Sequence, residues 1–198
     1  IGEKLKSNSM DFGIWFATAR NLDRQRFLEQ VDKLIQEHGM TCYRHDMNSH
    51  DESLLDLWDE LREKHPDLIW EGCCGGGRNI DLESVYRFHW HQKSDRWGDI
   101  ESDQCSLFGG NLFLPGGSLN IPTYYTDDYG AWSSFSGQLC LGWNPLDADF
   151  PFEHARRQVE LYKRIRPLLR GDFYPLTACS LTAPWLGYQF HRVGLDAG

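Results

Sequence analysis

The 198-residue chain lacks several patterns that mark whole classes of protein. It has no run of about 18 apolar residues, so its sequence predicts no membrane-spanning helix. Its 20 Lys and Arg residues are outnumbered by 29 Asp and Glu residues, which gives a net charge of −9. Nucleic acids and anionic membranes attract a positive face, so we expect neither as the main partner. The chain starts without Met or a signal-peptide pattern, which is typical of the middle of a longer chain. It contains no internal repeats.

Cysteine is sparse as well. No two of the six cysteines have the C-x-x-C spacing of a zinc knuckle, and the number is too low for a disulfide scaffold. We therefore expect free thiols, several of them buried.

Apolar and aromatic residues are well represented. The chain is 40% hydrophobic and contains eleven Phe, eight Trp and eight Tyr residues. This composition is typical of a globular domain with a packed core. Sugars stack on flat Trp faces, although most Trp residues in proteins belong to the core.

Strand and helix patterns alternate along the chain. Short apolar runs predict strands at residues 12–16, 40–44, 68–70, 88–92, 111–114 and 138–143. Helical spacing predicts a helix after a cap at Asn21 that ends at Gly39, and a helix that starts in a capping box at residues 49–52 and stops before Pro66. A short helix is predicted at residues 81–86, and a last one after a cap at Asp149, with its end near Pro167. The aromatic stretch 124–135 is predicted to be loop.

This alternation predicts an α/β fold with a parallel sheet. Six strand-centred units in about 170 residues fit a (β/α)8 TIM barrel that lacks its first two βα units. Residues 1–171 would be the partial barrel, with units 3 to 8, and residues 172–198 the first short strands of another domain. The alternative is an open doubly wound sheet, but its nucleotide-binding form needs a G-x-G-x-x-G motif, which is missing.

Polar residues gather where the predicted strands end, which is where barrels carry their active sites. Asp46 follows one strand, with Arg44 two residues earlier on the same face, and Asp95 follows another. A glycine run at residues 75–77 follows the strand between them and permits close approach of a ligand. Two aspartates that converge over a barrel are what glycoside hydrolysis requires, one as nucleophile and one as acid/base.

Each feature also has a structural explanation. Asp46 could cap the next helix or be ion-paired, and Asp99 and Asp103 compete with Asp95. We expect Asp81 to be structural, either paired with Arg78 or capping its helix. Cys73 fits a sugar contact and a small core residue equally well, whereas Cys74 is expected in the core. The H-x-H pair at residues 89 and 91 could bind zinc, but the sequence offers no third ligand.

Three motifs together resemble glycoside hydrolase family 36, the α-galactosidases of clan D. Residues 44–48 (R-H-D-M-N) are similar to the nucleophile motif K-W-D-M-N. Residues 71–83 (E-G-C-C-G-G-G-R-N-I-D-L-E) are similar to the signature E-x-C-x-x-G-G-R-x-I-D-L-E, and residues 93–95 (K-S-D) to the acid/base motif. Weaker similarities lie at residues 13–16, at 161–168, which resemble the last barrel helix, and at 188–192, which resemble the start of the C-terminal β-sandwich.

The resemblance implies a retaining mechanism in which Asp46 attacks the anomeric carbon. Asp95 would protonate the leaving oxygen and then activate water. The other implied site residues are those that would contact the sugar: Trp15 as a pocket wall, Arg20, Arg44 and Asn48 as polar ligands, and Cys73 and Gly76 near the sugar 2-position.

Four departures from the family pattern affect the expected sugar specificity. Arg44 replaces a Lys, and its planar fork must contact hydroxyls differently. His45 replaces a Trp, residues 17–19 replace E-P-E, and Trp132 stands where related sequences have Arg.

The sequence thus predicts a retaining glycoside hydrolase that cleaves terminal α-galactosides or closely related α-glycosides. The alternatives are a non-catalytic carbohydrate-binding relative and a metal-dependent barrel hydrolase. We expect an oligosaccharide or glycoside substrate and no cofactor or metal, and homo-oligomerisation stays open. A barrel without its first two units would leave these 198 residues an incomplete enzyme.

Overall fold

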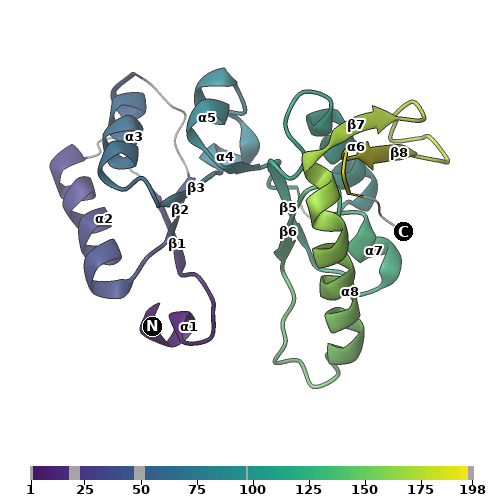
Figure 1. Cartoon of the computed structure of the whole chain (residues 1–198), viewed down its shortest axis with the longest axis horizontal. Coiled ribbons are helices and arrows are strands. Elements are labelled where there is room, and N and C mark those ends of the chain that lie inside the picture. Colours follow the sequence, from purple (N-terminus) through teal and green to yellow (C-terminus); the bar gives the residue numbers. More distant parts are fainter. Residues whose placement is uncertain (1, 18–22, 47–51, 97, 196–198) are drawn as a thin grey trace. The chain divides into compact units, whose positions relative to one another are not determined.

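The computed structural model describes residues 2–17, 23–46, 52–96 and 98–195 (Figure 1). It divides into two compact units, Ile1–Asp95 and Arg96–Gly198. No helix among the described residues is both long and apolar enough to cross a bilayer.

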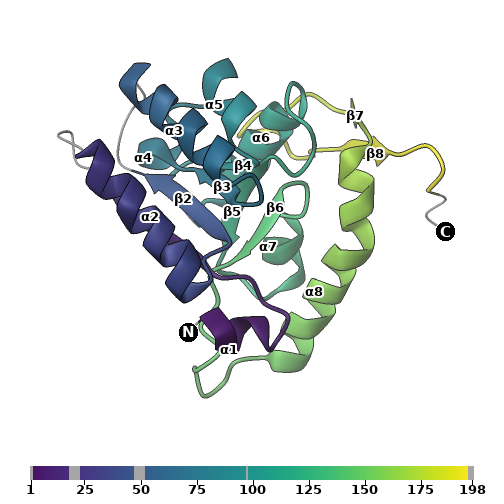
Figure 2. The ribbon, with the colours of Figure 1, turned by 60° about the vertical axis from the view of Figure 1, so that its left-hand side comes forward.

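The first unit is a parallel sheet of four strands with helices packed on one face. The strands pair in chain order, and their bounds are β1 (Gly13–Ala17), β2 (Cys42–Asp46), β3 (Ile69–Gly72) and β4 (Trp90–Gln92). The helices are α1 (Gly2–Lys6), α2 (Arg24–His38), α3 (Glu52–Lys64), the short turn α4 (Cys74–Gly77) and α5 (Leu82–Arg87). Helix α2 lies along β2 in Figure 2.

Helix α2 shows how local sequence sets these bounds. The Asp23 side chain caps its first turn by accepting from the Arg26 N–H at 3.1 Å. Gly39 ends the helix, as the sequence predicts, in a left-handed conformation with φ 69°. The predicted cap, Asn21, lies outside the described residues, and Asp23 takes that role.

The core of this unit lies between the sheet and its helices. Tyr43 and Trp70 point from β2 and β3 into this layer, with ring centroids 5.2 Å apart in an edge-to-face arrangement. Helices α2 and α3 close the layer with buried side chains at helical spacing: Phe27, Leu28, Val31, Leu54, Leu57, Trp58 and Leu61. The predicted apolar face of α3 is therefore the one that is buried.

The second unit contains a parallel pair of strands and an antiparallel hairpin. The strands are β5 (Leu119–Thr123), β6 (Gln138–Leu141), β7 (Asp172–Pro175) and β8 (Tyr188–His191). The helices are α6 (Ile100–Asn111), α7 (Asp128–Trp132), α8 (Phe152–Ile165) and the 3₁₀ helix η1 (Arg166–Arg170). Tyr162 ties α8 to the start of β6, because its hydroxyl donates to Gly137 O at 2.9 Å and accepts from Leu139 N at 3.2 Å.

Three predictions for this unit were wrong. The stretch 124–135, expected to be loop, contains α7 (Asp128–Trp132), whose first turn is capped by Asp127. The expected strand 111–114 is the end of α6 and the turn after it, where Leu114 N donates to Gly110 O. The strand lies instead at β5, whose Asn120 and Pro122 weaken a strand pattern. Asp149 does not cap α8, because the N-cap position is Pro151. The parallel α/β organisation is confirmed, whereas the missing barrel units and the β-sandwich stay predictions.

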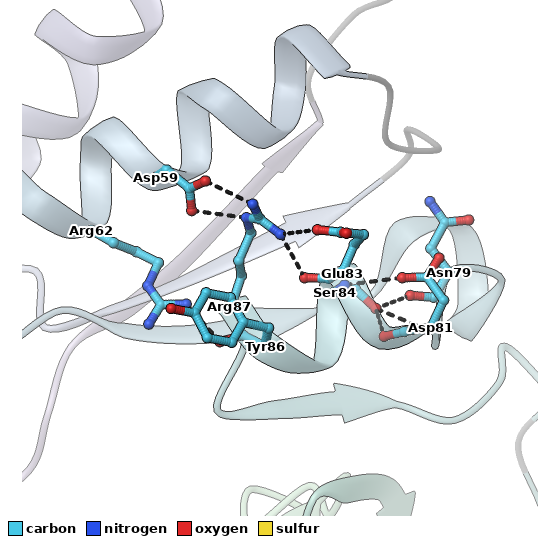
Figure 3. A network of polar contacts seen from close by, with 8 residues as sticks. All are labelled: Asp59, Arg62, Asn79, Asp81, Glu83, Ser84, Tyr86 and Arg87. Carbon is cyan, nitrogen blue, oxygen red and sulfur yellow. Dashed lines mark hydrogen bonds and ion pairs between the residues drawn. The ribbon is translucent and has the colours of Figure 1, made fainter.

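A charged cluster joins α3 to α5 in the first unit (Figure 3). The Arg87 guanidinium donates to both carboxylate oxygens of Asp59, at 2.8 and 2.7 Å, and to Glu83 at 2.6 Å. Its side chain is 10% exposed, whereas those of Asp59 and Glu83 are 44% and 59% exposed. Asp81 caps α5, one of the two structural roles expected for it. Its side chain accepts from Ser84 N, and the Ser84 hydroxyl accepts from Asp81 N.

Replacing Arg87 with Met should lower the free energy of unfolding by about 1–2 kcal/mol, because a bidentate, charge-assisted contact between two helices is lost. The expected loss of unfolding free energy is moderate because Asp59 and Glu83 are partly exposed, so water can solvate their carboxylates once Arg87 is replaced. Urea unfolding measures the change, and Glu83→Gln is the control, with an expected loss below about 0.5 kcal/mol. Equal losses of unfolding free energy in both variants would contradict a stabilising role for the contact of Arg87 with Asp59.

Two histidines are buried in the sheet of the first unit. His45 is fully buried; its Nδ1 lies 2.9 Å from the Tyr43 hydroxyl, and its ring packs edge-on to Trp58 at 4.9 Å. His91 packs on Phe88 with ring centroids 5.5 Å apart. Burial lowers the pKa of each imidazole to about 4. Both histidines are therefore neutral in the folded protein at neutral pH.

This predicts that stability falls on acidification between about pH 6.5 and pH 4, because the unfolded chain binds protons at both histidines there and the folded chain does not. His45→Phe should reduce the slope of unfolding free energy against pH by about one proton within that window. Urea unfolding at several pH values measures the slope. The exposed His38, changed to Gln, is the control, and a slope unaltered by His45→Phe would refute the assignment.

Candidate active site

The candidate site occupies the carboxyl ends of β2, β3 and β4. Tyr43 and His45 point into the helix-covered core, so the alternation of a strand places Arg44 and Asp46 on the opposite face. Arg44 is paired in register with Trp15 on one side and with Glu71 on the other. The sheet thus sets an aromatic side chain, a cation and an acid in one row on this face.

A left-handed turn follows β3 and brings backbone to the end of β2. Its four residues, Cys74 to Gly77, all have positive φ, from 50° to 80°. Cys73 N donates to His45 O at 2.8 Å, which continues the pairing of β2 and β3 into the turn. Gly75 N then donates to Asp46 Oδ1 at 3.1 Å. The turn thus supplies a backbone donor to the first candidate carboxylate.

Cys73 adds to the surroundings of Asp46. Its sulfur accepts from Gly76 N at 3.4 Å, and only 2% of the residue is exposed. Burial, together with a hydrogen bond to the Asp46 carboxylate, raises the pKa of the Cys73 thiol to about 11. The thiol therefore stays protonated and donates to Asp46. Cys74 faces the core, as predicted, and burial raises the pKa of its thiol to about 12.

The second candidate carboxylate lies against the same turn. A Cβ atom at Gly76 would be 2.5 Å from Asp95 Oδ2, a distance that no side chain could occupy. The other oxygen, Oδ1, accepts from Gln92 Nε2 at 2.7 Å. Gly75 and Gly76 are adjacent, so Asp46 and Asp95 contact consecutive residues of one turn.

Arg44 is held by two polar side chains. Its Nη1 donates to Glu71 Oε1 at 2.6 Å, and its Nη2 donates to Gln92 Oε1. The side chains of Arg44 and Glu71 are 22% and 12% exposed. The guanidinium charge is therefore balanced within the site, and its fork is fixed in direction.

The structure brings together most of the residues that the sequence singled out. Arg20 and Asn48 lie outside the described residues. The site residues that are described, all in the first unit, are Trp15, Arg44, Asp46, Cys73, Gly76 and Asp95. Trp15 is 55% exposed on the site face.

Sequence reasoning missed Glu71 and Gln92. The sequence analysis includes Glu71 only as the first residue of the motif at 71–83. Its place opposite Arg44 follows from aligning the parallel strands β2 and β3. Gln92 offered a weaker signal: an amide in an otherwise apolar and aromatic strand, three residues before a candidate catalytic Asp. Both side chains are needed to account for the position of Arg44.

The remaining polar candidates have structural roles. His89 Nδ1 accepts from Trp70 N at 3.0 Å, and His91 packs against Phe88. Within the described part of the chain, no three His, Cys, Asp or Glu side chains are grouped so that they could hold a metal ion. Asp99 caps α6 by accepting from Ser102 N at 3.1 Å.

Curated proteins similar to this chain are α-galactosidases, although no family model matches it. α-Galactosidase 1 of Pediococcus pentosaceus is 25% identical over 203 aligned positions, which cover 84% of this chain and 27% of that protein. The bifunctional α-galactosidase/sucrose kinase of Mediterraneibacter gnavus is 24% identical over 132 positions, 61% of this chain and 14% of that protein. The chain thus spans about a quarter or less of the length of these relatives.

Solved structures show the same fold. A Geobacillus stearothermophilus family 36 α-galactosidase, solved as an AgaA variant with 1-deoxygalactonojirimycin, superposes with a TM-score of 0.81 and 16% identity, over 96% of this chain and 36% of that one. The galactosidase domain of α-galactosidase-sucrose kinase AgaSK gives a TM-score of 0.75 and 20% identity, over 89% of this chain and 33% of that one. The comparisons thus confirm the resemblance read from the motifs: the chain is α-galactosidase-like, and its fold is that of part of the galactosidase domain of the solved family 36 enzymes.

Proposed function

We propose that the full-length protein hydrolyses terminal α-galactosides, or closely related α-glycosides, by a retaining double displacement. Asp46 is the nucleophile and Asp95 the acid/base. The observation that carries the proposal is the contact of both carboxylates with adjacent glycines of one turn. Retaining glycosidases need two carboxyl groups about 5–5.5 Å apart, and a shared backbone turn is a rigid means of setting such a distance.

The surroundings of Asp46 suit a nucleophile. It accepts hydrogen bonds from a backbone N–H and from the Cys73 thiol, both of which favour the ionised carboxylate. These donors also fix the direction of the carboxylate toward the open face of the sheet. An ionised, oriented carboxylate can attack the anomeric carbon and form a glycosyl-enzyme ester.

The surroundings of Asp95 suit an acid/base. One oxygen, Oδ1, is occupied by the Gln92 amide, and the other faces the glycine turn. As acid, Asp95 gives its proton to the leaving oxygen when the ester forms. As base, it takes a proton from the water that then attacks the same carbon, which returns both carboxyl groups to their starting states.

The open face has the groups that a sugar requires. Trp15 offers a flat, exposed ring beside Arg44, which could stack on a pyranose while polar groups bind its hydroxyls. Related structures were solved with raffinose and with 1-deoxygalactonojirimycin. We therefore propose an α-galactosyl group as the substrate unit, bound without a metal or an organic cofactor.

Replacing either carboxylate should separate the two roles. Asp46→Ala should remove nearly all turnover of every substrate. Asp95→Ala should retain turnover of aryl α-galactosides with good leaving groups, which need little protonation, and lose about 100-fold or more on those with poor ones. Azide should accelerate the Asp95→Ala variant by attacking the glycosyl-enzyme.

Steady-state kinetics with a series of aryl α-galactosides, and the anomeric form of the first product by NMR, test this scheme. Equal losses on good and poor leaving groups would exclude Asp95 as the acid/base. Sugar binding without turnover in the unaltered protein would favour a carbohydrate-binding function instead.

Gly76→Ala should lower turnover by about 100-fold, because its Cβ would displace the Asp95 carboxylate and small misplacements of catalytic groups are costly. Gly39→Ala, at the end of α2 and outside the proposed site, is a matched control: its φ is also positive, at 69°, but its Cβ would meet no atom within 4 Å. Both variants carry a similar backbone strain of about 1–2 kcal/mol.

Kinetics and urea unfolding on both glycine variants distinguish strain from displacement. Similar stability with a much larger loss of turnover in Gly76→Ala is the expected result. Equal losses of turnover would mean that the contact with Asp95 does not matter.

A further inference from the structure

Gln92 is a buried amide between two groups of the proposed site. It ends β4, and 1% of the residue is exposed. Burying an amide is unfavourable unless its polar atoms are bonded. Those atoms connect Arg44 on β2 with Asp95 beyond the end of β4.

The direction of each hydrogen bond in this chain is fixed by chemistry. A guanidinium only donates, so Gln92 Oε1 must face Arg44. The amide nitrogen then faces two acceptors, Asp95 Oδ1 at 2.7 Å and the Ser94 carbonyl at 3.0 Å. A flipped amide would place donor against donor, so only one orientation is stable.

This orientation makes the two oxygens of Asp95 different. Oδ1 accepts from the amide, and a proton placed on Oδ1 would oppose that bond. A proton on Asp95 is therefore favoured on Oδ2, the oxygen that faces Gly76. The acid proton would thus be held on the side of the glycine turn.

We propose, resting on the function proposed above, that Gln92 is a positioning residue for proton transfer by Asp95. It holds Oδ1 so that Oδ2 carries the proton toward the leaving oxygen, and it links this carboxyl group to the Arg44–Glu71 ion pair. It does not touch the substrate. Its amide matters through the orientation of Asp95 and Arg44.

The test compares two variants of the full-length protein on good and poor aryl leaving groups. Gln92→Met keeps the length of the side chain but removes all three of its hydrogen bonds, to Arg44, Ser94 and Asp95. Gln92→Glu keeps an acceptor for Arg44 but removes the donor to Asp95. Each should lose about 10-fold more kcat/KM on the poor leaving group than on the good one, a weaker form of the Asp95→Ala pattern.

Gln158→Met is the matched control. Gln158 is also buried, and its side chain accepts from Trp132 Nε1 at 2.7 Å. It belongs to the second unit and is far from Gln92 and Asp95 in the sequence. It should change turnover of both leaving groups by the same factor. Gln92→Glu, which is nearly isosteric, preserves the test where Gln92→Met does not fold.

The outcomes separate this inference from the proposed function. If the unaltered protein turns over the substrates and Asp95→Ala shows its leaving-group pattern, equal losses in both Gln92 variants overturn the positioning role alone. If the unaltered protein has no turnover, the proposed function falls and this inference falls with it. A selective loss on the poor leaving group in both Gln92 variants supports it.

Discussion

The candidate site depends on the close approach of one backbone turn to two carboxylates. At Gly76 the backbone comes so near Asp95 that no Cβ could fit, and at Gly75 the N–H reaches Asp46. Four consecutive positive φ values make this approach possible, although one of them belongs to Cys74, which anchors the turn in the core. The strain in the backbone of the turn is thus offset by the packing of Cys74 in the core and by the hydrogen bond of Gly75 to Asp46.

The sequence predicted those parts of the fold and site that rest on local patterns. Helices α2 and α3 have clear apolar periodicity, Asp46 ends β2, and Asp95 lies three residues beyond the end of β4. Helix α6 was missed because its glycines and polar residues hide the periodicity, and β5 because its Pro and Asn resemble a loop. The partners Glu71 and Gln92 could not be assigned from local patterns, because their roles arise only when three strands lie side by side.

Departures from the family pattern separate according to the face of the sheet on which they lie. His45, which stands where the family motif has Trp, points into the aromatic layer with Trp58 and is hydrogen-bonded to Tyr43, so it belongs to the core and not to the candidate site. Arg44, which replaces a Lys, lies on the site face and is held there by Glu71 and Gln92. The sequence analysis treats both replacements as changes that affect sugar specificity, but only Arg44 lies on the site face of the sheet.

The glycine turn also makes the candidate site depend on contacts between residues that are distant in the sequence. Its bond to Asp46 spans 29 residues, and a left-handed turn of four residues is unfavourable by itself. Closing such a loop costs chain entropy that only the paired strands β2 and β3 can offset. Because the turn that contacts both carboxylates follows β3 directly, their positions depend on the pairing of β3 with β2, and the Tyr43–Trp70 contact in the core supports the same pairing.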